Sequence, residues 1–175
     1  KGLILAETVN IVKNAGFTFS SAAVTDTGRV REKNEDSWHI DEELCLFMVA
    51  DGMGGHRGGA LASRIVTEDL PVLIETALYK LRSRSSRSIK NMLKKMIRRQ
   101  GRHLYLEGCS ESGYKYMGTT VAVLFLNAGR ACIANLGDSR VYRLRNGALK
   151  RLSRDHSVVS ELIEKDIIHP SQAED

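Results

Sequence analysis

The chain has 175 residues, 42% of them apolar and 27% charged, which is ordinary for a globular domain with a core of its own. No apolar run approaches the roughly 20 residues of a membrane-spanning helix, and the opening KGLILAETVN is too short and too polar for a secretory signal peptide. The net charge of +5 is local, because residues 80–102 hold ten Lys or Arg and no acid, whereas 16 basic and 21 acidic residues lie elsewhere. We therefore predict one domain, residues 1–175, that carries a single basic patch.

The three cysteines, Cys45, Cys109 and Cys132, are widely spaced and odd in number. Two of them lie in apolar, strand-like runs, where a reduced thiol packs as a small apolar group. Disulfides are rare in cytosolic proteins because that compartment keeps thiols reduced. We therefore expect reduced cysteines and a cytoplasmic location.

The first half of the chain begins with strand patterns. FTFSSAAVT, residues 17–25, predicts a first strand, and ELCLFMVAD, residues 43–51, predicts a second that is mostly buried. The polar stretch RVREKNEDSW between them is typical of a loop. No internal repeat and no long Pro- or Gly-rich linker interrupts the sequence, so nothing in it divides the predicted domain.

Two helices are predicted to follow. Apolar residues recur at three- and four-residue steps over residues 60–81, and Pro71 is expected to kink or divide this helix. The second helix has an apolar stripe over residues 89–97, with basic residues mainly on its other face. Either Ser86 or Ser88 is the expected N-cap of this second helix.

The apolar period then changes to two residues, which predicts a series of strands. Their ranges are 119–127, 130–138, 140–146 and 148–153. The connecting turns are very short, and Asn146-Gly147 is a typical hairpin pair, so neighbouring strands must be antiparallel. The tail SVVSELIEKDIIHP predicts a further helix that Pro170 ends. This order of elements predicts an α+β layered fold, in which helices cover antiparallel sheets.

Acidic residues stand beside the predicted strand ends. Asp51 closes a strand and precedes five glycines in eight residues, Glu35 and Asp36 lie in the polar loop, and Asp138 lies in the tight turn LGDSR. Hard cations such as Mg²⁺ and Mn²⁺ prefer carboxylate, carbonyl and water oxygens, and Gly52 adds a carbonyl that no side chain shields. Each residue alone has a simpler interpretation, as a turn or a solvated loop. Their joint occurrence favours a divalent metal site.

The patterns of several other catalytic classes are absent. No cysteine is followed six residues later by the arginine that a cysteine phosphatase needs to bind phosphate. DGMGGHRGG lacks the Gly-Lys-Ser/Thr ending of a P-loop, and neither GxSxG nor HExxH occurs. The five histidines form no cluster with the spacing of zinc ligands.

Five segments together resemble one family. TDTGRVREKNEDSW, MVADGMGGHRGG, MGTTVAVL, ANLGDSRVYRLRNG and LSRDHSVV have the order and spacing of the metal-dependent Ser/Thr protein phosphatases of the 2C type, above all the bacterial branch. The resemblance implies a sandwich of two antiparallel β-sheets flanked by helices. It also implies hydrolysis of phosphoserine and phosphothreonine in proteins by water that two Mn²⁺ or Mg²⁺ ions activate.

The resemblance assigns roles by position. Asp51 would bridge the two metal ions, with Gly52 contributing its carbonyl. Glu35 would serve the second ion, directly or through water, with Asp36 beside it. Arg31 would hold the substrate phosphate, because a guanidinium can grip two phosphate oxygens.

Four further positions complete the comparison with the family. Asp138 would help to bind a third, weaker ion. Thr119, Thr120 and Asp155 match family positions that we interpret as structural. Some relatives carry a histidine, proposed to protonate the leaving oxygen, where this chain has Met53, so we expect water or another group to act as the acid.

The resemblance also implies that ligands are missing. The family supplies two later aspartates, in Asp-Gly and Asp-Asn motifs, and this chain ends at Asp175 before either. We therefore expect weak metal binding, little turnover from these residues alone, and exposed sheet edges that favour self-association. The alternative is a non-catalytic 2C-like regulatory or binding domain.

The expected partners are phosphorylated proteins, in particular a cognate Ser/Thr kinase or its substrates, and no membrane. The basic segment 80–102 is most simply the solvated face of an amphipathic helix. Its lack of interleaved aromatic residues disfavours nucleic-acid binding. An acidic or phosphorylated protein partner fits its charge better.

Overall fold

The computed structural model describes residues 10–14, 17–54, 58–110, 114 and 117–156. Two helices occur in these residues, α1 (Gly58–Tyr79) and α2 (Ser86–Gly108). The strands are β1 (Asn10–Asn14), β2 (Phe17–Ser21), β3 (Asp36–Asp41), β4 (Leu46–Met53), β5 (Gly118–Thr119), β6 (Val121–Asn127), β7 (Arg130–Leu136), β8 (Tyr142–Arg145) and β9 (Ala148–Arg151). The α+β class predicted from the sequence is confirmed.

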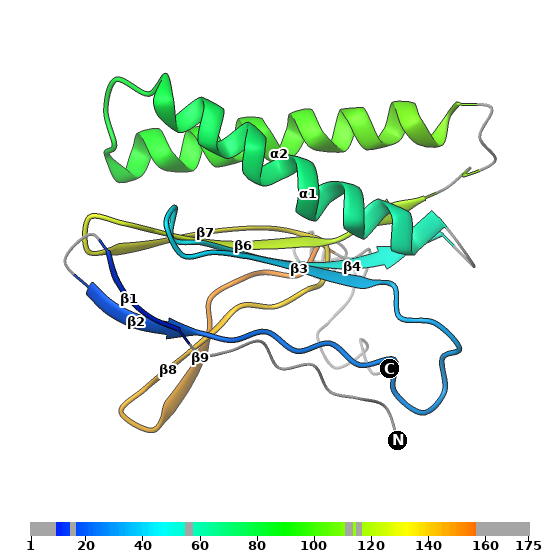
Figure 1. Cartoon of the computed structure of the whole chain (residues 1–175), viewed down its shortest axis with the longest axis horizontal. Coiled ribbons are helices and arrows are strands. Elements are labelled where there is room, and N and C mark those ends of the chain that lie inside the picture. Colours follow the sequence, from blue (N-terminus) through cyan, green and yellow to red (C-terminus); the bar gives the residue numbers. More distant parts are fainter. Residues whose placement is uncertain (1–9, 15–16, 55–57, 111–113, 115–116, 157–175) are drawn as a thin grey trace, which may run out of the picture.

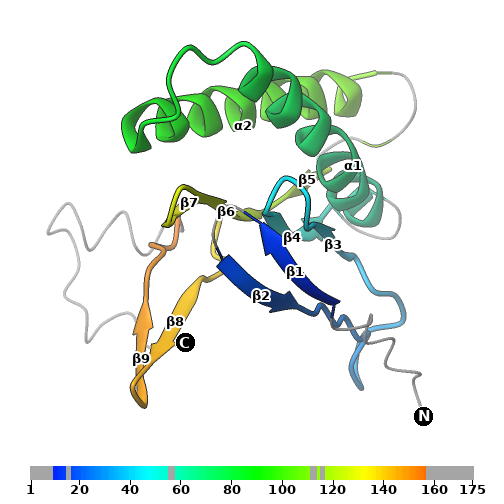
Figure 2. The ribbon, with the colours of Figure 1, turned by 60° about the vertical axis from the view of Figure 1, so that its left-hand side comes forward.

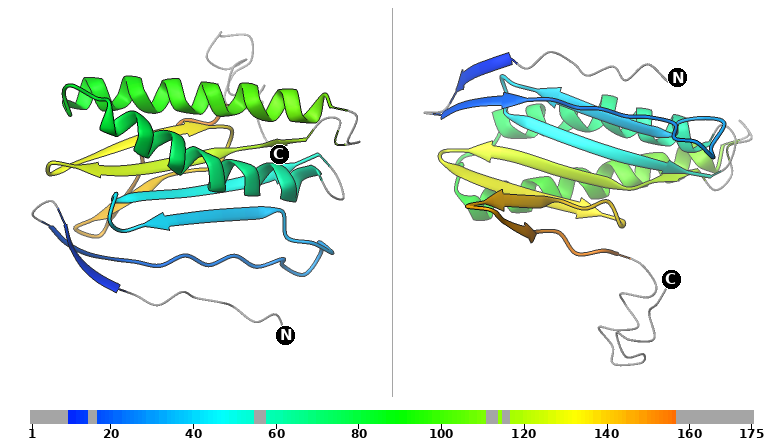
Figure 3. Two further views of the ribbon diagram at one scale, coloured as in Figure 1. Left: turned by 45° about the horizontal axis from the view of Figure 1, so that its top comes forward. Right: turned by 90° about the horizontal axis from the view of Figure 1, so that it is seen from below.

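Every strand pairing is antiparallel in the part of the chain that the structure describes. The main sheet has the order β3-β4-β6-β7, with β5 pairing onto the end of β4, and β1-β2 and β8-β9 form two hairpins. Both helices lie on one face of the main sheet, and the two hairpins lie on its other side (Figures 1 and 3). The predicted layering of antiparallel sheets and helices is therefore confirmed.

The core fills the space between the helices and the main sheet. Strand β4 alternates, so that Leu46, Met48 and Ala50 are buried while Val49, Asp51 and Met53 are exposed. Because successive strand residues point to opposite faces, the buried set faces the helices and Asp51 points to the opposite side. In Figure 2 the two hairpins lie on this opposite side of the main sheet, away from the helices. The alternation thus places the predicted metal ligand outside the core.

Helix α1 runs without interruption through Pro71, so the predicted division of this helix is wrong. Proline inside a helix removes one hydrogen bond and costs about 3 kcal/mol. Leu70 and Ile74, on either side, are completely buried in the core, and Pro71 is itself buried. Burial of large apolar side chains contributes about 1.5–3 kcal/mol each, which is enough to hold this turn in the helix.

Helix α2 shows the predicted apolar stripe, since Ile89, Met92, Leu93 and Met96 are buried. Its N-cap is Ser85, whose side chain accepts a hydrogen bond from the backbone N–H of residue 88 at 3.2 Å. The predicted caps, Ser86 and Ser88, therefore lie too far along the chain. Four serines occur between residues 83 and 88, and sequence alone does not distinguish them.

Several boundaries differ from the predictions. The first predicted strand ends at Ser21, and β1 was not predicted. Asp36 is not in a loop, because it begins the unpredicted strand β3. β4 starts three residues later than predicted and continues two residues past Asp51.

The later strands are close to their predicted ranges, although β5 and β6 replace the single strand predicted over residues 119–127. The helix predicted for residues 157–170 lies outside the described residues. Of the helices that the structure describes, none combines the length and apolarity needed to cross a bilayer.

Candidate metal centre

The first two acidic residues of the site face each other across neighbouring strands. Asp36 and Asp51 are register partners of β3 and β4, although 15 positions separate them in the sequence. Like charges directly opposite in an antiparallel pair destabilise the sheet. A pair of this kind therefore indicates a position where a positive charge is expected between the strands.

Thr120, which lies between β5 and β6, anchors the backbone of Asp51. Its hydroxyl oxygen accepts a hydrogen bond from the Asp51 N–H at 3.0 Å, and its own N–H donates to the Asp51 carbonyl at 2.9 Å. The Thr119 hydroxyl donates to the same carbonyl at 2.9 Å. The two threonines therefore hold the main chain of Asp51, in agreement with the structural role expected for them.

The glycines explain how Glu35 approaches β4. A Cβ on Gly52 would overlap the backbone of Gly59 and lie 2.7 Å from the Glu35 carbonyl, while one on Gly59 would lie 2.9 Å from the Glu35 carboxylate. The Gly52 N–H donates to the Glu35 carbonyl at 3.2 Å, and the buried Ser63 hydroxyl donates to it at 2.6 Å. Because Gly52 and Gly59 have no side chains, the backbones of β4 and α1 and the loop at Glu35 can lie in direct contact.

Asp138 reaches the same region from the turn after β7. Gly137, with φ of +98°, precedes it, and a Cβ there would lie 2.6 Å from the Thr120 side chain. The hydroxyl groups of Thr120 and Ser139 are hydrogen-bonded at 2.6 Å. Thr120 therefore couples the turn of Asp138 to the backbone of Asp51.

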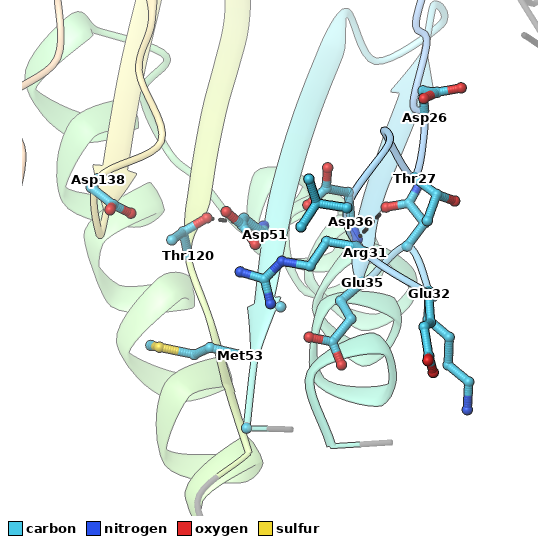
Figure 4. Close-up of a pocket in the computed structure, with 15 residues that line it drawn as sticks. Asp26, Thr27, Arg31, Glu32, Glu35, Asp36, Asp51, Met53, Thr120 and Asp138 are labelled. Carbon is cyan, nitrogen blue, oxygen red and sulfur yellow. Dashed lines mark hydrogen bonds between the residues drawn. The ribbon is translucent and has the colours of Figure 1, made fainter. Parts of the chain in front are cut away.

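These segments enclose one cleft of about 770 Å³. All six residues predicted for the site line it: Arg31, Glu35, Asp36, Asp51, Gly52 and Asp138. Figure 4 shows the Arg31 side chain extending across the cleft toward Asp51, while Asp138 approaches from the opposite side. The structure thus brings together residues that lie as much as 107 positions apart in the sequence.

Partial burial and the neighbouring carboxylates together raise the pKa of the Asp51 carboxyl. Partial burial is the largest cause, followed by the negative charges of Asp36 and Asp138, and the positive charge of Arg31 opposes them in part. Crowded carboxylates and partial burial both disfavour the ionised form. A divalent cation would relieve this repulsion, and carboxylate oxygens are the ligands that Mg²⁺ and Mn²⁺ prefer.

The carboxylates do not close around a single point, however. Among the described residues, no three Asp, Glu, His or Cys side chains come together as a bound ion requires. Water molecules or further ligands would complete the coordination of an ion in this cleft.

Three residues with a role near the site were not predicted. Lys33 adds a second cation to the cleft wall. Asn34 accepts a hydrogen bond from the Asp36 N–H at 3.0 Å and donates to the Thr25 hydroxyl at 2.6 Å, which fixes the loop. Ser63 occupies a core position of α1, and a serine within an otherwise apolar helical stripe was the available signal.

Thr120→Val is expected to lower the free energy of unfolding by about 1–3 kcal/mol, because it leaves the Asp51 N–H and the Ser139 hydroxyl without their partner. Urea denaturation measures this change. Thr119→Val is the matched control, and it should lose about 1 kcal/mol or less, since the Thr119 hydroxyl is more exposed. Equal losses in the two variants would contradict the assignment of Thr120 as the main anchor.

Asp155 ties the end of β9 to the beginning of β8. Its side chain is only 9% exposed and accepts three hydrogen bonds from Arg140, of 3.1 and 2.8 Å to one oxygen and 3.3 Å to the other. It also pairs with Arg151 at 2.9 Å. The His156 N–H donates to the Gly137 carbonyl at 2.9 Å. This arrangement supports the turn of Asp138, in keeping with the structural role expected for Asp155.

The stability that Asp155 contributes should depend on pH. Its hydrogen bonds from Arg140 lower the pKa of the carboxyl below 3.8. A depressed pKa stabilises the folded chain above pH 3.8, and this contribution is lost as the pH falls through the lower, folded-state value. Asp155→Asn should therefore lower the melting temperature at pH 7, and its difference from wild type should shrink as the pH falls below 3.8. A difference independent of pH between 7 and 2 would contradict this reasoning.

The fold is that of solved bacterial serine/threonine phosphatases. Stp1 from Staphylococcus aureus matches with a TM-score of 0.69 at 32% identity, over 85% of this chain and 58% of that chain. The catalytic domain of PstP, solved in complex with two manganese ions, matches with a TM-score of 0.63 at 30% identity, over 85% of this chain and 60% of that one.

The family follows from the sequence comparison. The model of protein phosphatase 2C matches residues 27–164, and the chain belongs to this family. The serine/threonine phosphatase Stp of Listeria welshimeri is 37% identical over 142 residues, which are 79% of this chain and 55% of Stp. The resemblance inferred from the five segments is thus confirmed. The chain spans little more than half the length of the curated relatives that it matches.

Proposed function

We propose that this protein hydrolyses phosphoserine and phosphothreonine in other proteins, and that residues 1–175 form one phosphatase-like domain. The observation that carries the proposal is the single cleft that Asp36, Asp51 and Asp138 line together with Arg31. The similarity to bacterial serine/threonine phosphatases supports an enzyme over a non-catalytic binding domain. Phosphorylated proteins, in particular a cognate Ser/Thr kinase or its substrates, are the proposed partners.

Two Mn²⁺ or Mg²⁺ ions are the proposed cofactors, with a third, weaker ion near Asp138. The manganese ions in PstP support this choice. Bound divalent ions would neutralise the phosphate and make water a stronger nucleophile at neutral pH. Asp51 would bridge the ions, Gly52 would add its carbonyl, and Glu35 would serve the second ion with Asp36 beside it.

The chain's own residues would position the substrate and shape the site. Arg31 would donate two hydrogen bonds to the phosphate oxygens and hold the ester in the cleft. The backbone hydrogen bonds of Thr120 would keep the Asp51 carboxylate pointing into the cleft. Since neither a cysteine nor a serine nucleophile lines the described cleft, water is the proposed attacking group.

The test uses the full-length protein and a phosphothreonine peptide, with phosphate release measured with and without Mn²⁺. Arg31→Ala should lower kcat/KM by at least about tenfold, because a bidentate, charge-assisted contact to phosphate is lost. Arg29→Ala is the matched control, since Arg29 is an exposed arginine that does not line the cleft, and it should stay within about twofold of wild type. Phosphate release that does not depend on Mn²⁺, or equal losses in both variants, would reject the proposal.

A further inference from the structure

A continuous cationic surface lies along helix α2, on the side away from the core. We call it the α2 basic face, and it consists of Arg87, Lys90, Lys94, Lys95, Arg98, Arg99 and Arg102. All seven side chains are exposed, while the apolar stripe of the same helix is buried. In the part of the chain that the structure describes, none of the seven makes an ion pair. Their charge is therefore available to a partner.

The arrangement of these charges disfavours the helix by itself. Lys90, Lys94, Arg98 and Arg102 follow one another at four-residue steps, so each consecutive pair is a like-charge neighbour that weakens the helix. Helix α1, by contrast, places opposite charges at this four-residue spacing, with Arg64 and Glu68 4.0 Å apart. A purely solvated face gains nothing from such repulsion, whereas an anionic partner would relieve it.

The neighbouring helix narrows the choice of partner. Helix α1 carries Glu68, Asp69 and Glu75, and the Asp69 carboxylate lies 3.8 Å from His103 of α2. Packed helices are only about 8–10 Å apart, so a flat anionic membrane or a DNA duplex on α2 would also approach Asp69, whereas Glu68 lines a pocket beside Trp38 of β3. No aromatic residue lies between Lys80 and Arg102 to stack with nucleic-acid bases. A single extended acidic strand can follow α2 alone.

The α2 basic face is followed by exposed apolar side chains at the C-terminal end of the helix. Tyr105 and Leu106, 69% and 57% exposed, follow Arg102 and add apolar contact area. Gly108, at the end of the helix, packs near the Met117 side chain, which directly precedes β5. Because β5 pairs with Gly52 and Met53, this end of α2 lies near the end of β4 that carries Asp51, on the face of the sheet opposite the cleft.

We propose that the α2 basic face docks an acidic segment of a partner protein outside the carboxylate cleft. The face from Arg87 to Arg102 is about 23 Å long at 1.5 Å per residue, which about seven extended residues would span. Side-chain carboxylates or phosphates of the segment would pair with the arginines and lysines, and an apolar residue at its end would contact Tyr105 and Leu106. This docking goes beyond the proposed hydrolysis and requires neither metal nor turnover.

The test measures binding of a fluorescent, Glu/Asp-rich peptide of about ten residues to the whole chain by anisotropy. Lys94→Glu/Arg102→Glu should raise its dissociation constant by at least about tenfold. The same substitutions should raise the melting temperature or leave it unchanged, because they put acids one turn from Lys90 and Arg98. If the α2 basic face had a purely structural role, the substitutions would not weaken peptide binding while leaving the melting temperature unchanged or higher.

Arg143→Glu/Lys150→Glu is the matched control, since these exposed cross-strand partners of β8 and β9 give the same change in net charge. It should change the dissociation constant by less than about twofold. Lys94→Gln/Arg102→Gln is a second variant that preserves helix propensity and should also weaken binding. Equal weakening by the control, unchanged binding by both α2 variants, or tighter binding of duplex DNA or phosphatidylserine vesicles than of the peptide would overturn the proposal.

Discussion

Asp51→Asn is expected to lower the Mn²⁺-dependent phosphatase activity of the full-length protein by roughly a hundredfold or more, while making the metal-free chain more stable. Loss of the bridging carboxylate would remove several kcal/mol of metal-assisted stabilisation of the transition state, and each 1.36 kcal/mol is a factor of ten in rate. Phosphate release from a phosphothreonine peptide measures the loss of activity.

The gain in stability follows from the raised pKa of Asp51. Burial and the nearby Asp36 and Asp138 carboxylates raise the pKa above 3.8, so the folded chain binds this proton more tightly than the unfolded chain does. Stability therefore falls as the pH rises through the folded-state pKa, and at pH 7 the ionised Asp51 destabilises the fold. Asparagine carries no charge and avoids this penalty.

Thermal unfolding at pH 7 in EDTA measures that second effect. Glu75→Gln, on the exposed surface of α1, removes the same charge away from the cleft and serves as the control. It should leave both the activity and the melting temperature nearly unchanged. An Asp51→Asn variant that is fully active, or one that melts below wild type without metal, would contradict the role given to Asp51.

Gly52→Ala is expected to destabilise the chain by about 3 kcal/mol or more. The added methyl group would overlap the backbone of Gly59 and lie 2.7 Å from the Glu35 carbonyl. Both obstacles are main chain, which cannot rotate away as a side chain can, so loop or helix would have to shift. Urea denaturation monitored by circular dichroism measures the change.

Gly101→Ala is the matched control, and it is expected to raise the free energy of unfolding that Gly52→Ala lowers. A Cβ on Gly101 meets nothing within 4 Å, and the residue lies inside α2. Alanine there should stabilise the chain by about 0.5–1 kcal/mol, because glycine disfavours a helix interior. If Gly52→Ala were as stable as wild type, the close contact of loop, strand and helix would be wrong.

The sequence was a good guide wherever local pattern decides structure. The helices followed from apolar residues at three- and four-residue steps, and the β8-β9 hairpin followed from Asn146-Gly147. The six site residues were found because each lies in a short segment that resembles the family. Their placement around one cleft agrees with that assignment, and their individual roles remain predictions.

The errors occurred where tertiary contacts decide. Strand β3, with the sequence DSWHID, lies at a sheet edge and has only two apolar residues, Trp38 and Ile40, which is too short an alternation to distinguish it from the polar loop before it. Pro71 stays helical because its neighbours are buried in the core. The pairing of Asp36 with Asp51 depends on the register of β3 against β4, which no local pattern reveals.

The most direct test of the metal centre is a crystal structure of the full-length protein grown with Mn²⁺ and measured for anomalous scattering. We predict an anomalous peak in the cleft, about 2.0–2.3 Å from a carboxylate oxygen of Asp51, with Asp36, Glu35 or Asp138 within reach through water. The same crystals of Asp51→Asn should lose this peak. Manganese bound elsewhere, or a wild-type cleft without a peak, would contradict the convergence of these carboxylates on a divalent ion.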